Sequence, residues 1–144
     1  MTHKEKGHYA NKHASDRKID DRIVKMVKEK SSNEEIPCAV AFDIANDLKA
    51  SPEEVGFTID SLEIKIVKCQ LGLHGYQPHR KKVKPADSVP PGLEKEIREA
   101  LVDDRLPCGA AWEIAERSNL TKMEVSSACE ALNIKISSCQ LGTF

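Results

Sequence analysis

The sequence predicts a mainly α-helical protein with short β-strands, built from two copies of one unit. The first observation is an internal repeat: residues 36–74 and 106–144 align without a gap at a constant offset of 70. Within 37–72, fifteen of the 36 positions are identical to their counterparts. The second observation is that apolar residues recur at helical 3–4 spacing in three segments of each copy. The third is a short alternating segment after the last of these helices, which is typical of a strand.

The first helix of copy 1 is expected over about Asp20–Lys30, with Ile23 and Val27 on one apolar face. Its counterpart in copy 2 is expected over Leu93–Val102. Both segments are amphipathic, so each should cover a small core with one side and face water with the other.

The second and third helices carry start signals at equivalent positions. Pro37 and Pro107 stand where a second helix would begin, because proline suits a first turn. Ser51 and Thr121 are each followed three residues later by a glutamate, which is the pattern of a capping box. We therefore expect a third helix to begin just after Ser51 and just after Thr121.

The third helix of each copy leads into an expected strand, over Ile64–Leu73 and Ile134–Leu141. A strand with an unpaired edge is a liability. We therefore expect the two strands to pair with each other in a small shared antiparallel sheet. The alternative is that each pairs with a short strand at its own proline, around Ile36–Pro37 or Leu106–Pro107.

This order of elements resembles a helix-turn-helix unit of the winged-helix kind, present twice in tandem. In copy 1 the resemblance rests on Ala41-x-x-Ile44-Ala45, the turn Leu48–Ser51, Val55, and Leu62-x-Ile64. In copy 2 it rests on Ala111-x-x-Ile114-Ala115, the turn Asn119–Thr121, Val125, and Leu132-x-Ile134. The resemblance implies a third helix that reads the major groove of DNA. One departure is that copy 2 ends at Phe144, directly after its strand.

The charges divide the chain into four segments, although its net charge is only −1. A basic flexible arm, residues 1–19, carries +3, and a basic proline-bounded linker, residues 77–90, also carries +3. The two repeats are acidic, with −4 over residues 20–76 and −3 over residues 91–144. Positive charge for a polyanionic partner is therefore expected from the arm and the linker.

Five basic residues are the candidate contacts to nucleic acid: Arg80, Lys81, Lys82, Lys84 and Lys122. Four of them lie in the linker, and the fifth begins the third helix of copy 2. Lys and Arg neutralise phosphates, so the linker could act as a phosphate-contacting strap. The other interpretation of the linker is a solvated spacer that its charge keeps extended. The leading hypothesis is a transcription-regulator-like module that binds double-stranded DNA.

The expected outer faces of the third helices favour a different partner. They carry Glu53, Glu54, Phe57 and Asp60 in copy 1 and Met123 in copy 2. Carboxylates would be repelled by a duplex, whereas a protein partner could use this face. The alternative hypothesis is therefore a protein–protein interaction module.

The cysteines suggest a third and weaker hypothesis. Cys38 and Cys69 recur as Cys108 and Cys139, a set that could hold a metal ion or act as a thiol sensor. Buried cysteines that behave as small apolar residues are the favoured interpretation, and Cys129 lies on an inner helical stripe.

Catalytic motifs with a phosphate-binding loop, a nucleophile elbow or a zinc-protease helix are not found in the sequence. We expect no enzymatic activity and no cofactor. No apolar stretch approaches the ~20 residues of a membrane span, so we expect a cytoplasmic protein without a membrane partner.

Overall fold

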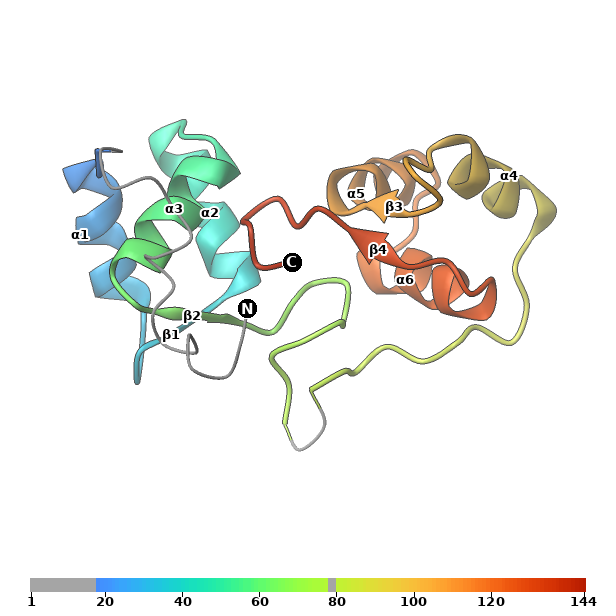
Figure 1. The fold of residues 1–144 in the computed structure, drawn as a ribbon, viewed down its shortest axis with the longest axis horizontal. Coiled ribbons are helices and arrows are strands. Elements are labelled where there is room, and N and C mark those ends of the chain that lie inside the picture. Colours follow the sequence, from blue (N-terminus) through green and yellow to red (C-terminus); the bar gives the residue numbers. More distant parts are fainter. Residues whose placement is uncertain (1–17, 78–79) are drawn as a thin grey trace. The chain divides into compact units, whose positions relative to one another are not determined.

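The computed structural model describes residues 18–77 and 80–144, and this part of the chain is mainly helical (Figure 1). The expected basic arm lies almost entirely outside the described residues. Copy 1 contains α1 (Asp21–Lys30), β1 (Glu35–Pro37), α2 (Cys38–Leu48), α3 (Pro52–Ser61) and β2 (Lys65–Val67). Copy 2 contains α4 (Pro91–Glu99), β3 (Leu106–Pro107), α5 (Cys108–Arg117), α6 (Lys122–Ala131) and β4 (Ile136–Ser137).

The helices begin at the residues that the sequence indicates, except that α4 begins at Pro91 rather than Leu93 and ends at Glu99 rather than Val102. The Asp20 carboxylate caps α1 by accepting the Arg22 N–H at 2.9 Å. Pro37 and Pro107 are the N-caps of α2 and α5. These caps and prolines set the first turn of each helix locally, which is why the sequence predicts them well.

The third helices also start at the expected hydroxyl residues. The Ser51 and Thr121 hydroxyls each accept a backbone N–H from the glutamate three residues later, at 3.1 Å. In copy 2 the Glu124 carboxylate also accepts the Thr121 N–H, which completes the capping box. The start of α3 and of α6 is therefore fixed by the hydrogen bond that the sequence predicts.

The prediction of a shared antiparallel sheet is wrong. β1 pairs with β2, and β3 pairs with β4, in two separate two-stranded parallel sheets. The alternative is confirmed, since each strand pairs beside its own proline: Ile36 lies opposite Ile66, and Leu106 opposite Ile136. The strands are also shorter than expected. A parallel pair forms within each copy because the two helices between its strands return the chain in the same direction.

The two copies adopt left-handed backbone conformations at equivalent positions. Residues with a left-handed φ recur at the offset of 70: Asn33, Glu34, Lys49, Glu63, Lys68 and Gly72 in copy 1, and Asp103, Asp104, Asn119, Asn133, Ser138 and Gly142 in copy 2. Most of these residues are not glycine, and an L-residue adopts a positive φ only when its surroundings require it. The two copies therefore share their turns as well as their helices.

Contacts divide the chain into two compact units. Unit 1 contains the described residues up to Cys69 together with Leu141–Thr143, and unit 2 contains the described residues of 70–140 together with Phe144. In unit 1, α1, α2 and α3 all pack on one another. In unit 2, α5 packs on α6, and α4 packs mainly on α5. Unit 2 thus includes the linker, and unit 1 includes residues from the end of copy 2.

Each unit has a small aliphatic core at equivalent positions. Ile44 and Val55 are completely buried in unit 1, and so are Ile114 and Val125 in unit 2. None of the helices in the described part of the chain is long and apolar enough to cross a membrane.

Candidate nucleic-acid interface

The basic linker is not a free spacer, because backbone hydrogen bonds and one buried side chain attach it to the rest of unit 2. The backbone N–H groups of Lys82 and Val83 both donate to the Gly72 carbonyl, at 2.8 and 3.0 Å. Further along, the Ala86 N–H donates to the Ser127 carbonyl of α6 at 3.0 Å. The Val83 side chain is buried, with 6% of its surface exposed. We call residues 80–84 the basic strap, and these bonds hold it beside α6.

The cations of the basic strap face water. Arg80, Lys82 and Lys84 are all exposed, and the last two flank the buried Val83 in sequence. Side chains alternate along an extended segment, so an inward Val83 turns its two lysine neighbours outward. The Lys82 ammonium lies 5.3 Å from the centre of the Tyr76 ring, which restrains its position. The strap therefore presents several positive charges from a fixed backbone.

Lys81 differs from the other strap residues because it forms an ion pair with Glu130 of α6. Both side chains remain partly exposed. This pair ties the strap to the helix and neutralises one of its charges. Lys81 is thus better placed to position the strap than to contact a phosphate.

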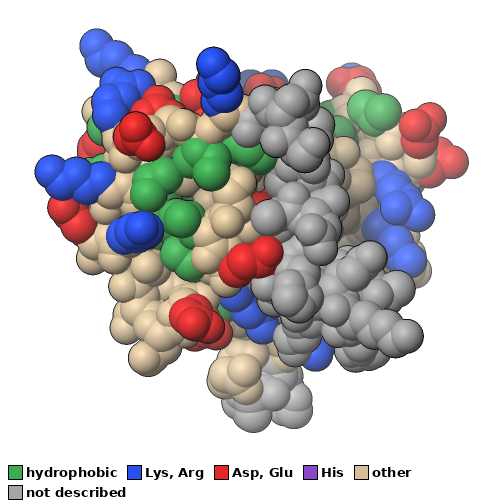
Figure 2. Space-filling view, turned by 60° about the vertical axis from the view of Figure 1, so that its left-hand side comes forward, with side chains coloured by type: hydrophobic (Ala, Val, Ile, Leu, Met, Phe, Trp, Pro, Cys, Tyr) green, Lys and Arg blue, Asp and Glu red, His purple; other side chains and the backbone are tan. Residues whose placement is uncertain are grey.

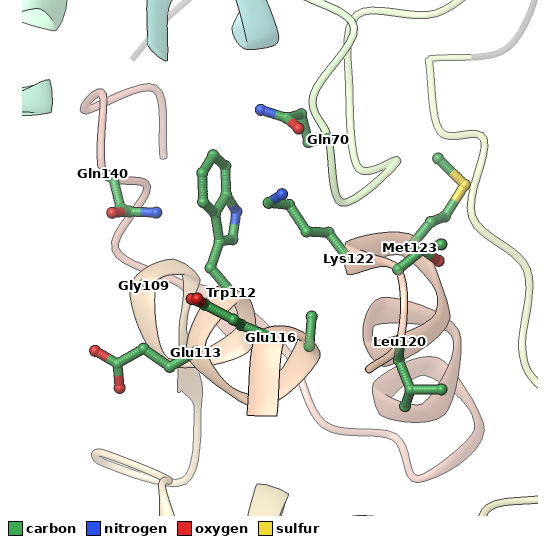
Figure 3. A pocket seen from close by; sticks show the side chains of 11 residues that line it. Gln70, Gly109, Trp112, Glu113, Glu116, Leu120, Lys122, Met123 and Gln140 are labelled. Carbon is green, nitrogen blue, oxygen red and sulfur yellow. The ribbon is translucent and has the colours of Figure 1, made fainter. Parts of the chain in front are cut away.

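The fifth candidate residue, Lys122, lies in an open pocket of unit 2. Its ammonium is 4.3 Å from the centre of the Trp112 ring, which is within the range of a cation–π interaction. Figure 3 shows this ammonium pointing toward the ring and toward Gln70. Lys122 is therefore held by an aromatic neighbour near the N-terminus of α6 and is not part of the strap.

The pocket around Lys122 has a volume of about 730 Å³. Its walls come from α5, the turn into α6, the first residues of α6, and two glutamines of the Cys-Gln-Leu-Gly segments. The lining side chains include Trp112, Glu113, Met123, Gln70 and Gln140 (Figure 3). Sequence reasoning did not identify Trp112 or the glutamines. The available signal was the recurrence of glutamine in both copies and the replacement of Phe42 by tryptophan.

The expected acidic face of α3 is only partly present. Glu53 and Glu54 are exposed in the first turn of α3. The placement of Phe57 and Asp60 on an exposed face is wrong, since they are only 6% and 5% exposed. Every residue of α3 from Val55 to Asp60 is buried, because this part of the helix is covered on all sides. Of the partner surface expected on α3, only the two glutamates are thus exposed.

The face drawn in Figure 2 does not carry charged side chains of only one sign. Acidic and basic side chains are interspersed over its described part, with apolar side chains between them. Attraction of a polyanion by a broad basic surface is therefore not supplied by this face. The strap is the more concentrated source of positive charge among the described residues.

The repeated cysteines lie at equivalent positions in the two copies. Cys38, Cys69 and Cys108 are buried, and Cys139 is half-buried. The Gln140 side-chain amide lies 3.8 Å from the Cys108 sulfur. In the described part of the chain, no three or more His, Cys, Asp or Glu side chains are grouped as metal ligands would be. Burial among apolar residues is the environment that the sequence favoured for these thiols.

Cys129 of α6 is almost fully buried, with 1% of its surface exposed. Burial raises the pKa of its thiol to about 11, and the charge of Glu130 acts in the same direction. A thiol with so high a pKa is protonated at neutral pH and is a poor nucleophile. Cys129 therefore belongs to the core of unit 2.

Comparison with known proteins gives no match of any kind: no family model, no curated protein and no solved structure is similar to this chain.

Proposed function

We propose that the chain is a DNA-binding module that holds the duplex through unit 2. The observation that carries this proposal is the anchored basic strap, which presents Arg80, Lys82 and Lys84 to solvent from a backbone fixed beside α6. A fixed strap loses less conformational entropy on binding than a flexible linker would. Lys122, at the start of the same helix, could add a further phosphate contact.

We further propose that each copy is a helix-turn-helix unit, which would make the chain regulator-like. The arrangement α2–turn–α3 supports this, with a left-handed Lys49 in the turn, and α5–turn–α6 repeats it with Asn119. The parallel pairs β1–β2 and β3–β4 differ from the shared antiparallel sheet that we expected. The unit proposed here is therefore a helix-turn-helix closed by a small parallel sheet. A cytoplasmic location suits it, since all five cysteines are thiols.

The proposal assigns little direct reading of bases to the third helices. The exposed residues of α3 include Glu53 and Glu54, and α6 exposes Glu124. Base edges are normally read by Arg, Lys, Asn or Gln. We therefore expect binding to a duplex that depends strongly on salt and weakly on sequence.

The test is a titration of duplex DNA at several salt concentrations with the triple variant Arg80→Gln, Lys82→Gln, Lys84→Gln. Each phosphate contact contributes about 0.9 to the slope of log K against log salt, so the slope should flatten by up to ~2.7. The matched control is Lys25→Gln, Lys28→Gln, Lys30→Gln, which removes three exposed lysines from α1 in unit 1. Equal effects of the two triple variants, or no binding by the intact protein at ~50 mM salt, would contradict the proposal.

A second candidate function is docking of a protein partner, and the pocket of unit 2 is the observation that favours it. The pocket combines Trp112 and Met123 with several polar side chains, a mixture that is typical of interaction surfaces. The double variant Glu113→Gln, Glu116→Gln, at two exposed glutamates that line the pocket, separates the two functions. Removing these carboxylates should strengthen binding of DNA to unit 2, whereas a protein partner docked in the pocket through them would be bound more weakly.

A further inference from the structure

The two Cys-Gln-Leu-Gly segments occupy unexpected places in the two units. Copy 1 supplies α1, α2 and α3 to unit 1, but its Gln70, Leu71 and Gly72 belong to unit 2. Copy 2 supplies α4, α5 and α6 to unit 2, but its Leu141–Thr143 segment belongs to unit 1. Each unit thus contains the leucine and glycine that the other copy encodes.

Within unit 1, the segment Leu141–Thr143 packs closely on α3. Leu141 is 2% exposed. A Cβ placed on Gly56 would lie 3.0 Å from the Leu141 Cα and nearer still to the Leu141 carbonyl. Glycine is therefore required at position 56, because only a residue without a side chain lets the two backbones approach so closely.

Within unit 2, the equivalent segment of copy 1 contacts the strap and α6. Leu71 is completely buried. The Gly72 carbonyl accepts the two strap N–H groups, and a Cβ on Gly72 would lie 3.1 Å from the Met123 methyl of α6. Gly72 also has a φ of +74°, which favours glycine. Leu71 and Gly72 are thus integral parts of unit 2.

We propose that the duplicated chain is a segment-exchanged pair within one polypeptide. The third helix of each unit carries a binding surface for a Leu-Gly segment, and the occupant of that surface is the segment encoded by the other copy. The burial of both leucines supports this, since a buried leucine contributes strongly to the stability of the unit that surrounds it. The strap anchored on Gly72 is then held in place by a segment of copy 1.

The exchange is tested by two single variants of the full chain, Leu141→Ala and Leu71→Ala. Hydrogen exchange is measured separately on the amides of α3 and of α6. Leu141→Ala should accelerate exchange in α3 by about tenfold or more and leave α6 within about twofold, although Leu141 is encoded in copy 2. Leu71→Ala should do the reverse.

A second pair of variants keeps the test decisive if a leucine variant fails to fold. Gly56→Ala should displace the Leu141 backbone and accelerate exchange in α3. The control is Ser126→Ala at the equivalent position of α6, where a Cβ is already present, and it should not accelerate exchange in α3. Acceleration of α6 rather than α3 by Leu141→Ala overturns the exchange. Equal acceleration of both helices by Gly56→Ala overturns it as well.

Discussion

The two copies share a backbone and differ in the surface that surrounds the start of the third helix. Ile44 and Ile114 are completely buried at equivalent positions, and each is followed by an alanine that is also buried. At the start of the third helix, Pro52 and Glu53 of copy 1 are replaced by Lys122 and Met123 of copy 2. Both of these substituted residues, Lys122 and Met123, line the pocket of unit 2. The identity of Ile44 and Ile114 therefore maintains the core, whereas the substitutions at the start of the third helix give the two units different surfaces.

The third helices differ further in how completely they are covered. Phe57 and Asp60 of α3 are buried, whereas their counterparts Ser127 and Glu130 of α6 are half-buried. On α6, the Ser127 carbonyl and the Glu130 carboxylate both bind the linker. The comparison indicates that α3 acts mainly as a core helix, while α6 also supports the basic strap.

The largest expected effect tests whether the two cores are equivalent. Ile44→Ala and Ile114→Ala each remove a buried side chain from the second helix of their unit, and each should lower the free energy of unfolding by about 3–4 kcal/mol. Urea denaturation measures both changes. A cost below about 1 kcal/mol for one variant alone would show that the two cores are not equivalent.

A smaller effect distinguishes the third helices by pH, because Ile59 of α3 is replaced by Cys129 in α6. The Cys129 thiol has a pKa of about 11 in the folded protein, against 9.0 without burial. As the pH rises above about 9, the unfolded state loses this proton first. The stability contributed by the neutral thiol is complete below that pH and falls by roughly 2–3 kcal/mol by pH 11.

The measurement for this prediction is the free energy of unfolding of the intact protein and of Cys129→Ala between pH 8 and about 11. The intact protein should lose more stability over this range, because the variant has no thiol at that position. Parallel pH profiles would mean that Cys129 does not titrate differently in the folded and unfolded states. Lysines and the other thiols affect both proteins alike and cancel in the difference.

The sequence predicts where the helices of this fold begin better than it predicts which strands pair with each other. Helix starts at Asp20, Ser51 and Thr121 depend on neighbours within three residues, and all three were predicted. The partner of each strand depends on how the intervening helices return the chain, so the sequence left two choices, and the structure shows the parallel one.

The sequence predicts which basic residues form the candidate site, but it does not predict where they lie in the structure. The cations of the strap were found from charge alone, whereas their anchoring depends on Gly72 and Ser127, which are distant in sequence from each other. The sequence did not predict the burial of Phe57 and Asp60. The spacing of apolar residues in α3 indicates only the face that packs on the other helices of the same copy. Contact between Gly56 and Leu141 comes from a segment far along the chain, and nothing in the sequence of α3 reports it.

The smallest expected effect concerns the turn before the first strand of each copy. Asn33 and Glu34 have φ angles of 53° and 62°, and Asp103 and Asp104 have 51° and 62°. In both copies the flanking residues exchange backbone hydrogen bonds, as Ser32 does with Glu35 at 2.9 and 3.0 Å. Two consecutive positive φ values are required by a type I′ turn, whose second central residue is preferably glycine.

Glu34→Gly and Asp104→Gly should therefore each raise the free energy of unfolding by about 1 kcal/mol or less, because glycine adopts this φ without steric cost. Part of the gain is offset by the greater flexibility of glycine in the unfolded chain. Urea denaturation of the two single variants measures the change. The equal φ values of the two copies predict equal gains, whereas a loss of stability in one variant alone would show that its carboxylate makes a contact that its counterpart lacks.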